Sequence, residues 1–190
     1  MSPFRIEGYV IVSADGMLAD TNGVMPDTLK FEGDKQFFTT ALDHADLIVH
    51  GRHSHEGQPN SPQRKRIVVT RTVPRVADDP MIPKTTLWNP AGAPFDVACG
   101  HAGVHAGTIA IIGGPNVFEM FMDSYDTFWL SQASKVRLPD GEPVFSGVPR
   151  LTPQEILSSH GLRPGQSRLL DAGDGVTVTP WQRTRTSQTS

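Results

Sequence analysis

The chain has 190 residues, of which 37% are hydrophobic and 19% are charged, a composition typical of one globular domain rather than a disordered segment. Its formal net charge of −3 gives no general attraction to nucleic acid or to an anionic membrane, so we expect neither as a partner. The single cysteine, Cys99, excludes an internal disulfide framework and indicates a reducing compartment. Because no signal-peptide pattern and no apolar run of membrane-spanning length is visible, we expect a cytoplasmic protein.

Apolar residues in the first part of the chain predict three strands and one helix. Phe37, Phe38 and Leu42 recur at helical spacing, which predicts a helix over residues 34–42. Residues 17–26 contain aspartate, asparagine, glycine and proline, and we expect them to form a loop directly after a buried strand. The three strands are expected at residues 8–13, 46–50 and 66–70.

The second part of the chain begins with an irregular segment and ends with a hairpin. Residues 74–83 hold three prolines and two aspartates, which favours irregular surface chain. Two short runs predict a strand at residues 85–88 and a helix at residues 94–99. Further strands are expected at residues 108–112 and 127–131, a hairpin from residues 167–170 and 175–180, and a polar tail at residues 184–190.

A double glycine lies between a buried strand and a helix start. Residues 108–112 are apolar or β-branched without alternation, as in a strand covered on both faces. Gly113 and Gly114 follow, and Pro115 has the fixed φ that suits the first turn of a helix. Such a turn lets backbone N–H groups face an anion, although a plain tight turn gives the same pattern. The segment is neither a GxGxxG fingerprint nor a phosphate-binding loop with lysine.

Strands that alternate with short helices and end in a hairpin predict one α/β domain over residues 1–183, with a mostly parallel central sheet and an antiparallel C-terminal hairpin. Ligands of such sheets bind at the carboxyl ends of the strands. Three predicted strands end in glycine or basic residues, at Gly51-Arg52, Thr70-Arg71 and Gly113-Gly114. Since parallel strands place these ends on one edge, we expect a nucleotide site there.

Three segments that follow strands resemble motifs of the dihydrofolate reductase-like superfamily. Val49-His-Gly-Arg-His-Ser54 resembles the strand and phosphate-binding turn of dihydrofolate reductases, and Arg64-Lys-Arg-Ile-Val-Val-Thr-Arg71 resembles their next strand, which meets the adenosine 2′-phosphate. Ile111-Ile-Gly-Gly-Pro-Asn-Val-Phe118 resembles the shared helix start under the pyrophosphate. The resemblance covers residues 9–145 and implies a three-layer fold of this superfamily that binds NADPH.

Two further segments resemble other branches of the superfamily. Ser13-Ala-Asp-Gly-Met-Leu-Ala19 resembles a motif of the reductase domain of riboflavin-biosynthesis deaminase-reductases, and Leu138-Pro-Asp-Gly-Glu-Pro-Val-Phe145 resembles a late stretch of short stand-alone members. The resemblance implies cofactor contacts from the residues that align with the phosphate-binding motifs, namely Gly51, Arg52, His53, Ser54, Thr70, Arg71, Gly113, Gly114, Pro115, Asn116 and Val117. An arginine offers a planar fork of donors to phosphate, whereas the plain alternative for Arg52 and Arg71 is a solvated surface position.

The resemblance also implies a pocket carboxylate and its neighbours. Asp34-Lys-Gln-Phe-Phe38 matches an Asp-x-x-x-Phe pattern whose aspartate binds the pteridine, so Asp34 is the catalytic candidate, and Met25, Phe38 and Ser131 are the substrate-binding candidates. Glu32 lies close enough to compete with Asp34 for this role, and without the resemblance a helix N-cap is the preferred role of Asp34.

The substrate is less defined than the cofactor. Asp27 follows Met25-Pro26 where dihydrofolate reductases have a tryptophan, which predicts a polar pocket wall, and the chain lacks two features usual in the riboflavin branch. We therefore expect an NADPH-dependent reductase of a pterin- or aminopyrimidine-type substrate, with a riboflavin-pathway reductase as the alternative. A non-catalytic NADP(H)-binding module is the alternative of another class, and a homodimer is compatible with the sequence.

Histidine clusters raise the alternative of a metal site. His50, His53 and His55 lie close together in the sequence, and His101 and His105 are four residues apart. No cysteine pair and no HExxH motif accompanies them, so we expect no metal.

Overall fold

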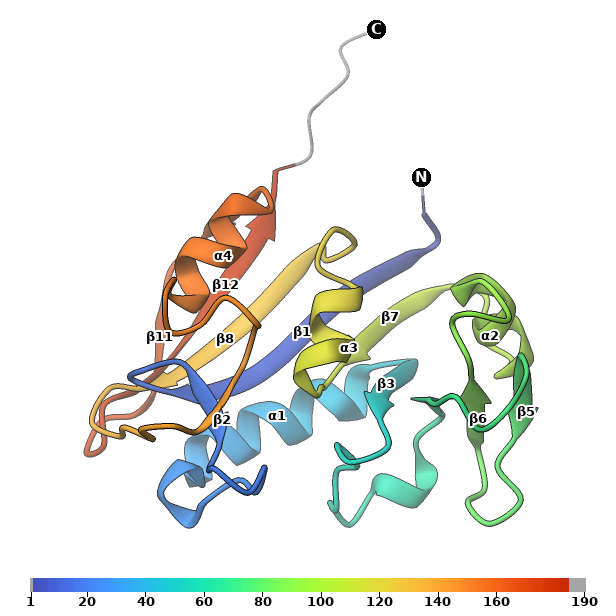
Figure 1. Cartoon of the computed structure of the whole chain (residues 1–190), viewed down its shortest axis with the longest axis horizontal. Helices are drawn as coiled ribbons and strands as arrows, with labels where there is room; N and C mark the ends of the chain where they lie inside the picture. The colour runs from blue at the N-terminus through green and yellow to red at the C-terminus, as the bar shows by residue number, and fades with distance from the viewer. Residues whose placement is uncertain (1, 185–190) are drawn as a thin grey trace, which may run out of the picture.

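The computed structural model describes residues 2–184, so that the predicted tail, apart from its first residue, lies outside the described part of the chain. A ten-stranded sheet crosses the molecule in the order β10-β12-β8-β1-β7-β3-β4-β6-β5, with β11 paired to β12 (Figure 1). Its strands are β1 (Phe4–Ser13), β3 (Leu47–Gly51), β4 (Arg66–Val69), β5 (Val76–Asp78), β6 (Thr85–Trp88), β7 (Gly107–Ile111), β8 (Thr127–Ala133), β10 (Leu162–Pro164), β11 (Arg168–Asp171) and β12 (Val176–Arg183). A second, two-stranded sheet pairs β2 (Met17–Ala19) with β9 (Glu142–Pro143).

The centre of the large sheet is parallel and its margins are antiparallel. β1 pairs in parallel with both β7 and β8, and β3, β4, β6 and β7 continue the parallel part. β12 runs antiparallel to β8, β10 and β11, and β5 runs antiparallel to β6. The predicted parallel sheet with an antiparallel C-terminal hairpin is therefore confirmed. Its consequence is that β3, β4, β6 and β7 end on the same edge.

Helices cover both faces of this sheet, which gives three layers. α1 (Glu32–His44) packs Leu42 against Ile48 and Ala110 on one face. Residues of α2 (Phe95–His101), α3 (Pro115–Met120) and α4 (Pro153–Ser159) join the larger core on the other face, where Val49 and Ile111 point. The alternation of Ile48 and Val49 between two cores explains why β3 is apolar at successive positions from Leu47 to Val49. No helix among residues 2–184 combines the length and hydropathy needed to cross a bilayer.

The structure corrects the predicted elements at several places. Residues 17–19 form the strand β2 instead of a loop, because β9 pairs with them, and residues 76–78 form β5 within the segment predicted to be irregular. Between β3 and β6, where no helix was predicted, the connections contain one 3-10 turn at Ser61–Gln63 and β5. α4 and β10 were not predicted, although Thr152 and Glu155 form a capping box at the start of α4.

Candidate functional site

A cleft of about 1040 Å³ opens at the carboxyl edge of the parallel strands. Its lining contains every residue that the sequence assigned to the site, namely Met25, Asp34, Phe38, Gly51, Arg52, His53, Ser54, Thr70, Arg71, Gly113, Gly114, Pro115, Asn116, Val117 and Ser131. The volume is at the upper end of what small-molecule sites occupy, and it accommodates a ligand longer than a single heterocycle. The structure thus brings these residues together, while their roles stay predictions.

The turns after β3 and β7 form one surface inside the cleft. The backbone N–H of Gly51 donates to the carbonyl oxygen of Gly113 at 2.8 Å. Gly113 has a φ of +114°, which residues with a side chain rarely adopt, and the peptide bond between Gly113 and Gly114 is cis. A Cβ at Gly114 would lie 3.3 Å from the Oγ of Ser54, in the space between the two turns. Glycine at position 114 therefore keeps a backbone surface open to a ligand.

Arg52 and Arg71 stand at the rim of this surface, at the ends of β3 and β4. Both side chains are exposed, and neither forms an ion pair with another residue of the described chain. Thr70, which precedes Arg71, is buried, and its hydroxyl accepts a 3.2 Å hydrogen bond from the backbone N–H of Thr72. The turn after β4 is thus held in place, while the guanidinium at its end can still contact a phosphate.

A buried polar cluster anchors the loop that carries Arg52. The side chain of Arg66, which is 1% exposed, donates to Glu56 at 2.7 Å and to the backbone carbonyl oxygen of Ser61 at 2.9 Å. Arg66 also contacts the Nε2 of His50 at 3.1 Å, so that Nε2 is the acceptor and the Nδ1 of His50 donates to the carbonyl oxygen of Gly51 at 2.7 Å. Burial, aided by the nearby charge of Arg66, lowers the pKa of His50 to about 4, which keeps this histidine neutral.

This arrangement bears on the metal alternative. His50 uses both ring nitrogens within the cluster, and His53 and His55 are exposed in the turn after β3. Among residues 2–184 no three histidine, cysteine or carboxylate side chains gather as metal ligands would. Cys99 lies buried in α2, and burial raises the pKa of its thiol to about 12, so that it packs as a small apolar side chain.

Asp34 lies in the first turn of α1 and faces the cleft. The N-cap of this helix is Phe31, and no side chain caps it, so Asp34 does not have the N-cap role that is its plain alternative. Burial raises the pKa of Asp34 to about 6, and hydrogen bonding with Ser131 opposes part of this shift. Glu32 is exposed, accepts a hydrogen bond from Gln36 and is outside the cleft lining. The geometry therefore favours Asp34 over Glu32 as the pocket carboxylate.

The cleft also has walls that the sequence did not indicate. Asn89, Pro90 and Ala91 follow β6, so the strand-end rule that found the other turns applies to them as well. Glu142 reaches the cleft because β9 pairs with β2, a contact that no local sequence pattern predicts. Asp27 is exposed, pairs with Lys30 at 2.8 Å and does not line the cleft, so the predicted polar wall is not formed by this residue.

Comparisons with solved structures identify this architecture. The chain aligns over 95% of its length with a protein provisionally assigned to riboflavin biosynthesis from Shewanella sp. PV-4, covering 99% of that chain at a TM-score of 0.65 and 20% identity. A dihydrofolate reductase from Enterococcus faecalis complexed with NADP(H) aligns over 95% of this chain and 97% of that one, at a TM-score of 0.66 and 14% identity. The chain has the dihydrofolate reductase-like fold.

A third structure has the same fold as part of a longer protein. A deaminase and 5-amino-6-(5-phosphoribosylamino)uracil reductase from Thermotoga maritima aligns over 95% of this chain but 56% of that chain, at a TM-score of 0.65 and 13% identity. No model of a known family matches the sequence, and neither does any curated protein. In this dihydrofolate reductase-like fold the cleft lies between α1 and the carboxyl ends of β3, β4 and β7.

Proposed function

We propose that the protein is an NADPH-dependent reductase that transfers a hydride to a pterin- or aminopyrimidine-type substrate. The observation that carries the proposal is the shared cleft, in which a half-buried carboxyl group, Asp34, lines the same cavity as the Gly113-Gly114 turn. A titratable group with a perturbed pKa inside a large cleft is a functional candidate. The structure of a dihydrofolate reductase with NADP(H) shows that the same fold accommodates this cofactor in that protein.

The chain's own residues fit such a cofactor. The glycine surface of Gly51 and Gly114 leaves room for a pyrophosphate against backbone, and Arg52 and Arg71 offer guanidinium groups at the rim for phosphate oxygens. Ser54 lies between the two turns and can donate from its hydroxyl group. When bound, NADPH supplies the hydride. The protein's task is then to hold both reactants and to exclude water.

Asp34 would orient the substrate and handle a proton. A carboxyl group with a pKa of about 6 changes between its neutral and charged forms close to neutral pH, which suits a group that accepts and returns a proton. Its two oxygens can also meet paired N–H donors of an aminopyrimidine edge, and such pairing compensates for the cost of burying the charge. Phe38, one turn later on α1, provides an apolar wall beside it.

Two alternatives follow from the same cleft. The motif at residues 13–19 and the uracil reductase with the same fold support a ribosylaminopyrimidine phosphate as the substrate. Alternatively, the chain binds NADP(H) without catalysis. NADPH that binds but is never oxidised by a candidate substrate distinguishes this module from an enzyme.

The test measures NADPH oxidation in the presence of dihydrofolate, dihydropterins and 5-amino-6-(5-phosphoribosylamino)uracil. Wild type should oxidise NADPH with at least one of them, and Asp34→Asn should lower turnover by roughly a hundredfold or more while leaving the NADPH dissociation constant nearly unchanged. Glu32→Gln is the matched control, since it removes a carboxylate of the same helix turn that lies outside the cleft. Equal turnover by Asp34→Asn and wild type would remove Asp34 from the reaction.

A further inference from the structure

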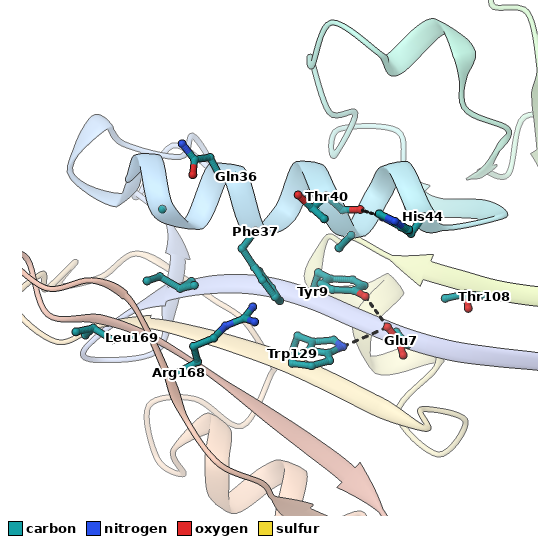
Figure 2. Close-up of a pocket in the computed structure, with 13 residues that line it drawn as sticks. Glu7, Tyr9, Gln36, Phe37, Thr40, His44, Thr108, Trp129, Arg168 and Leu169 are labelled. Atoms are coloured by element: carbon teal, nitrogen blue, oxygen red, sulfur yellow. Dashed lines mark hydrogen bonds between the residues drawn. The ribbon is translucent and has the colours of Figure 1, made fainter.

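A second cavity flanks α1 on the side away from the glycine turns. This trough, of about 550 Å³, lies between α1 and the strands β1, β8 and β11 (Figure 2). Its walls are aromatic and its rim is polar, with a lining of Glu7, Tyr9, Gly33, Gln36, Phe37, Thr40, Ala41, His44, Thr108, Trp129, Arg168, Leu169 and Leu170. One end is closed, because a Cβ at Gly33 would overlap the carbonyl oxygen of Leu170 where β11 crosses α1.

A buried carboxylate lies at the base of the trough. Glu7 is 8% exposed, and it accepts hydrogen bonds from the hydroxyl of Tyr9 and from the Nε1 of Trp129 at 3.2 Å (Figure 2). It also accepts a hydrogen bond from the Nε of Arg5, with which it forms an ion pair. Burial and the bond to Glu7 raise the pKa of Tyr9 well above its usual range, so that Tyr9 stays a donor. The charge of Glu7 is therefore already balanced, and its presence gives no reason to expect a cationic ligand.

Arg168 supplies the unbalanced charge of the trough. Its guanidinium carbon lies 5.1 Å from the ring centroid of Phe37, as a cation over an aromatic face (Figure 2). Within residues 2–184, Arg168 forms no ion pair with a carboxylate. The ring centroids of Phe37 and Trp129 are 5.6 Å apart, so the cation lies next to two flat apolar surfaces.

We infer that this trough is a binding site for a planar aromatic anion. The ring of the ligand packs against Trp129 and Phe37, and its carboxylate or comparable group meets the guanidinium of Arg168, whose planar fork of donors matches a carboxylate. Stacking over Phe37 holds that fork beside the apolar wall. A cationic ligand is disfavoured because the guanidinium of Arg168 repels it.

The trough and the cleft are separate sites with a common wall. Tyr9 and Phe37 are the two residues that line both cavities, while the glycine turns, Arg52 and Arg71 line the cleft alone. An anion in the trough therefore leaves the residues expected to hold NADPH accessible. This separation gives the inference a test that does not depend on the proposed reaction.

The test uses calorimetric titration of the full chain with 1-naphthoate, in the absence and the presence of saturating NADPH. We expect one site of unchanged affinity in both titrations, with weaker binding of benzamidinium, a planar cation. Arg168→Gln should weaken 1-naphthoate binding by roughly tenfold or more, as expected for a lost bond to a charged group. Arg150→Gln, a change of another exposed arginine that lines neither cavity, should leave the affinity unchanged.

Four results would overturn the inference. Equal affinities of wild type and Arg168→Gln, or no measurable binding of 1-naphthoate to wild type, would show that Arg168 forms no anion site. Displacement of 1-naphthoate by NADPH would place the anion in the cleft instead. Tighter binding of benzamidinium than of 1-naphthoate would identify the aromatic walls and Glu7 as a cation site.

Discussion

The backbone N–H of Gly51 and the carbonyl oxygen of Gly113 are joined by a hydrogen bond of 2.8 Å. This bond extends the parallel pairing of β3 and β7, in which Val49 lies opposite Ile111, to the last residue of β3 and past the end of β7. The two turns therefore keep a fixed relative position. Both turns line the same cleft, so a ligand bound between them can contact both, and we assign both to one proposed cofactor site.

Gly114→Val should weaken NADPH binding more than it weakens the fold. A Cβ at position 114 already lies 3.3 Å from the Oγ of Ser54, and the branched side chain would fill the space between the two turns. Gly57→Val is the control, because a Cβ at Gly57 has no neighbour within 4 Å. Calorimetry should show a large loss of affinity for Gly114→Val only. Normal binding by a Gly114→Val protein that melts early would assign this glycine to packing alone.

The two rim arginines should make the protein prefer NADPH to NADH. Because a hydrogen bond to a charged group contributes about 1.5–3 kcal/mol, Arg52→Gln or Arg71→Gln should weaken NADPH binding by roughly ten- to a hundredfold. Binding of NADH should change less if the lost contact was to the 2′-phosphate. Arg75→Gln, an exposed arginine outside the cleft, serves as the control. Equal dissociation constants of wild type for the two cofactors would contradict this assignment.

Asp34→Asn should stabilise the protein at neutral and alkaline pH but not in acid. The pKa of Asp34 rises from 3.8 in the unfolded chain to about 6 in the folded one, so the folded state binds the extra proton. The proton on Asp34 stabilises the folded wild type by up to roughly 3 kcal/mol. This stabilisation is complete below pH 3.8 and is lost as the pH rises through 6. Urea unfolding should show that the free energy of unfolding of Asp34→Asn, relative to that of wild type, is higher at about pH 8 than at about pH 4. A pH-independent difference would mean that Asp34 is solvated.

Glu56→Gln should destabilise the fold by about 3–5 kcal/mol, the usual cost of leaving one partner of a buried ion pair uncompensated. Glu56 and Arg66 have side chains that are 4% and 1% exposed. Although burial acts to raise the pKa of Glu56, its bond to Arg66 lowers it, so the stabilisation is present above the unfolded pKa and is lost in acid. Asp27→Asn removes an exposed pair with Lys30 and should leave the midpoint of urea unfolding unchanged. Equal midpoints of wild type and Glu56→Gln would contradict the prediction.

The strand ends that line the cleft could be predicted because their signals are local. A buried strand followed by glycine or arginine identifies a strand end, and parallel pairing brings Gly51, Arg71 and Gly113 to one edge. The same rule, applied to the strand that ends at Trp88, would have included residues 89–91.

Features that depend on distant pairing could not be predicted in this way. Residues 76–78 form a strand only because β6 lies beside them, and Glu142 reaches the cleft only through its pairing with β2. The trough combines Glu7 from the first strand with Arg168 from the C-terminal hairpin, two residues that share no sequence motif. The missed α4 differs, since its capping box of Thr152 and Glu155 was visible in the sequence.

The most direct test of the proposed reaction follows the hydride itself. Protein is incubated with NADPH that carries deuterium at the transferred position and with each candidate heterocycle, and the products are analysed by mass spectrometry. We predict deuterium in one reduced product with wild type and with Glu32→Gln, and at least roughly a hundredfold less with Asp34→Asn, which still binds NADPH. Bound NADPH with no label in any product would contradict it and identify the chain as a binding module.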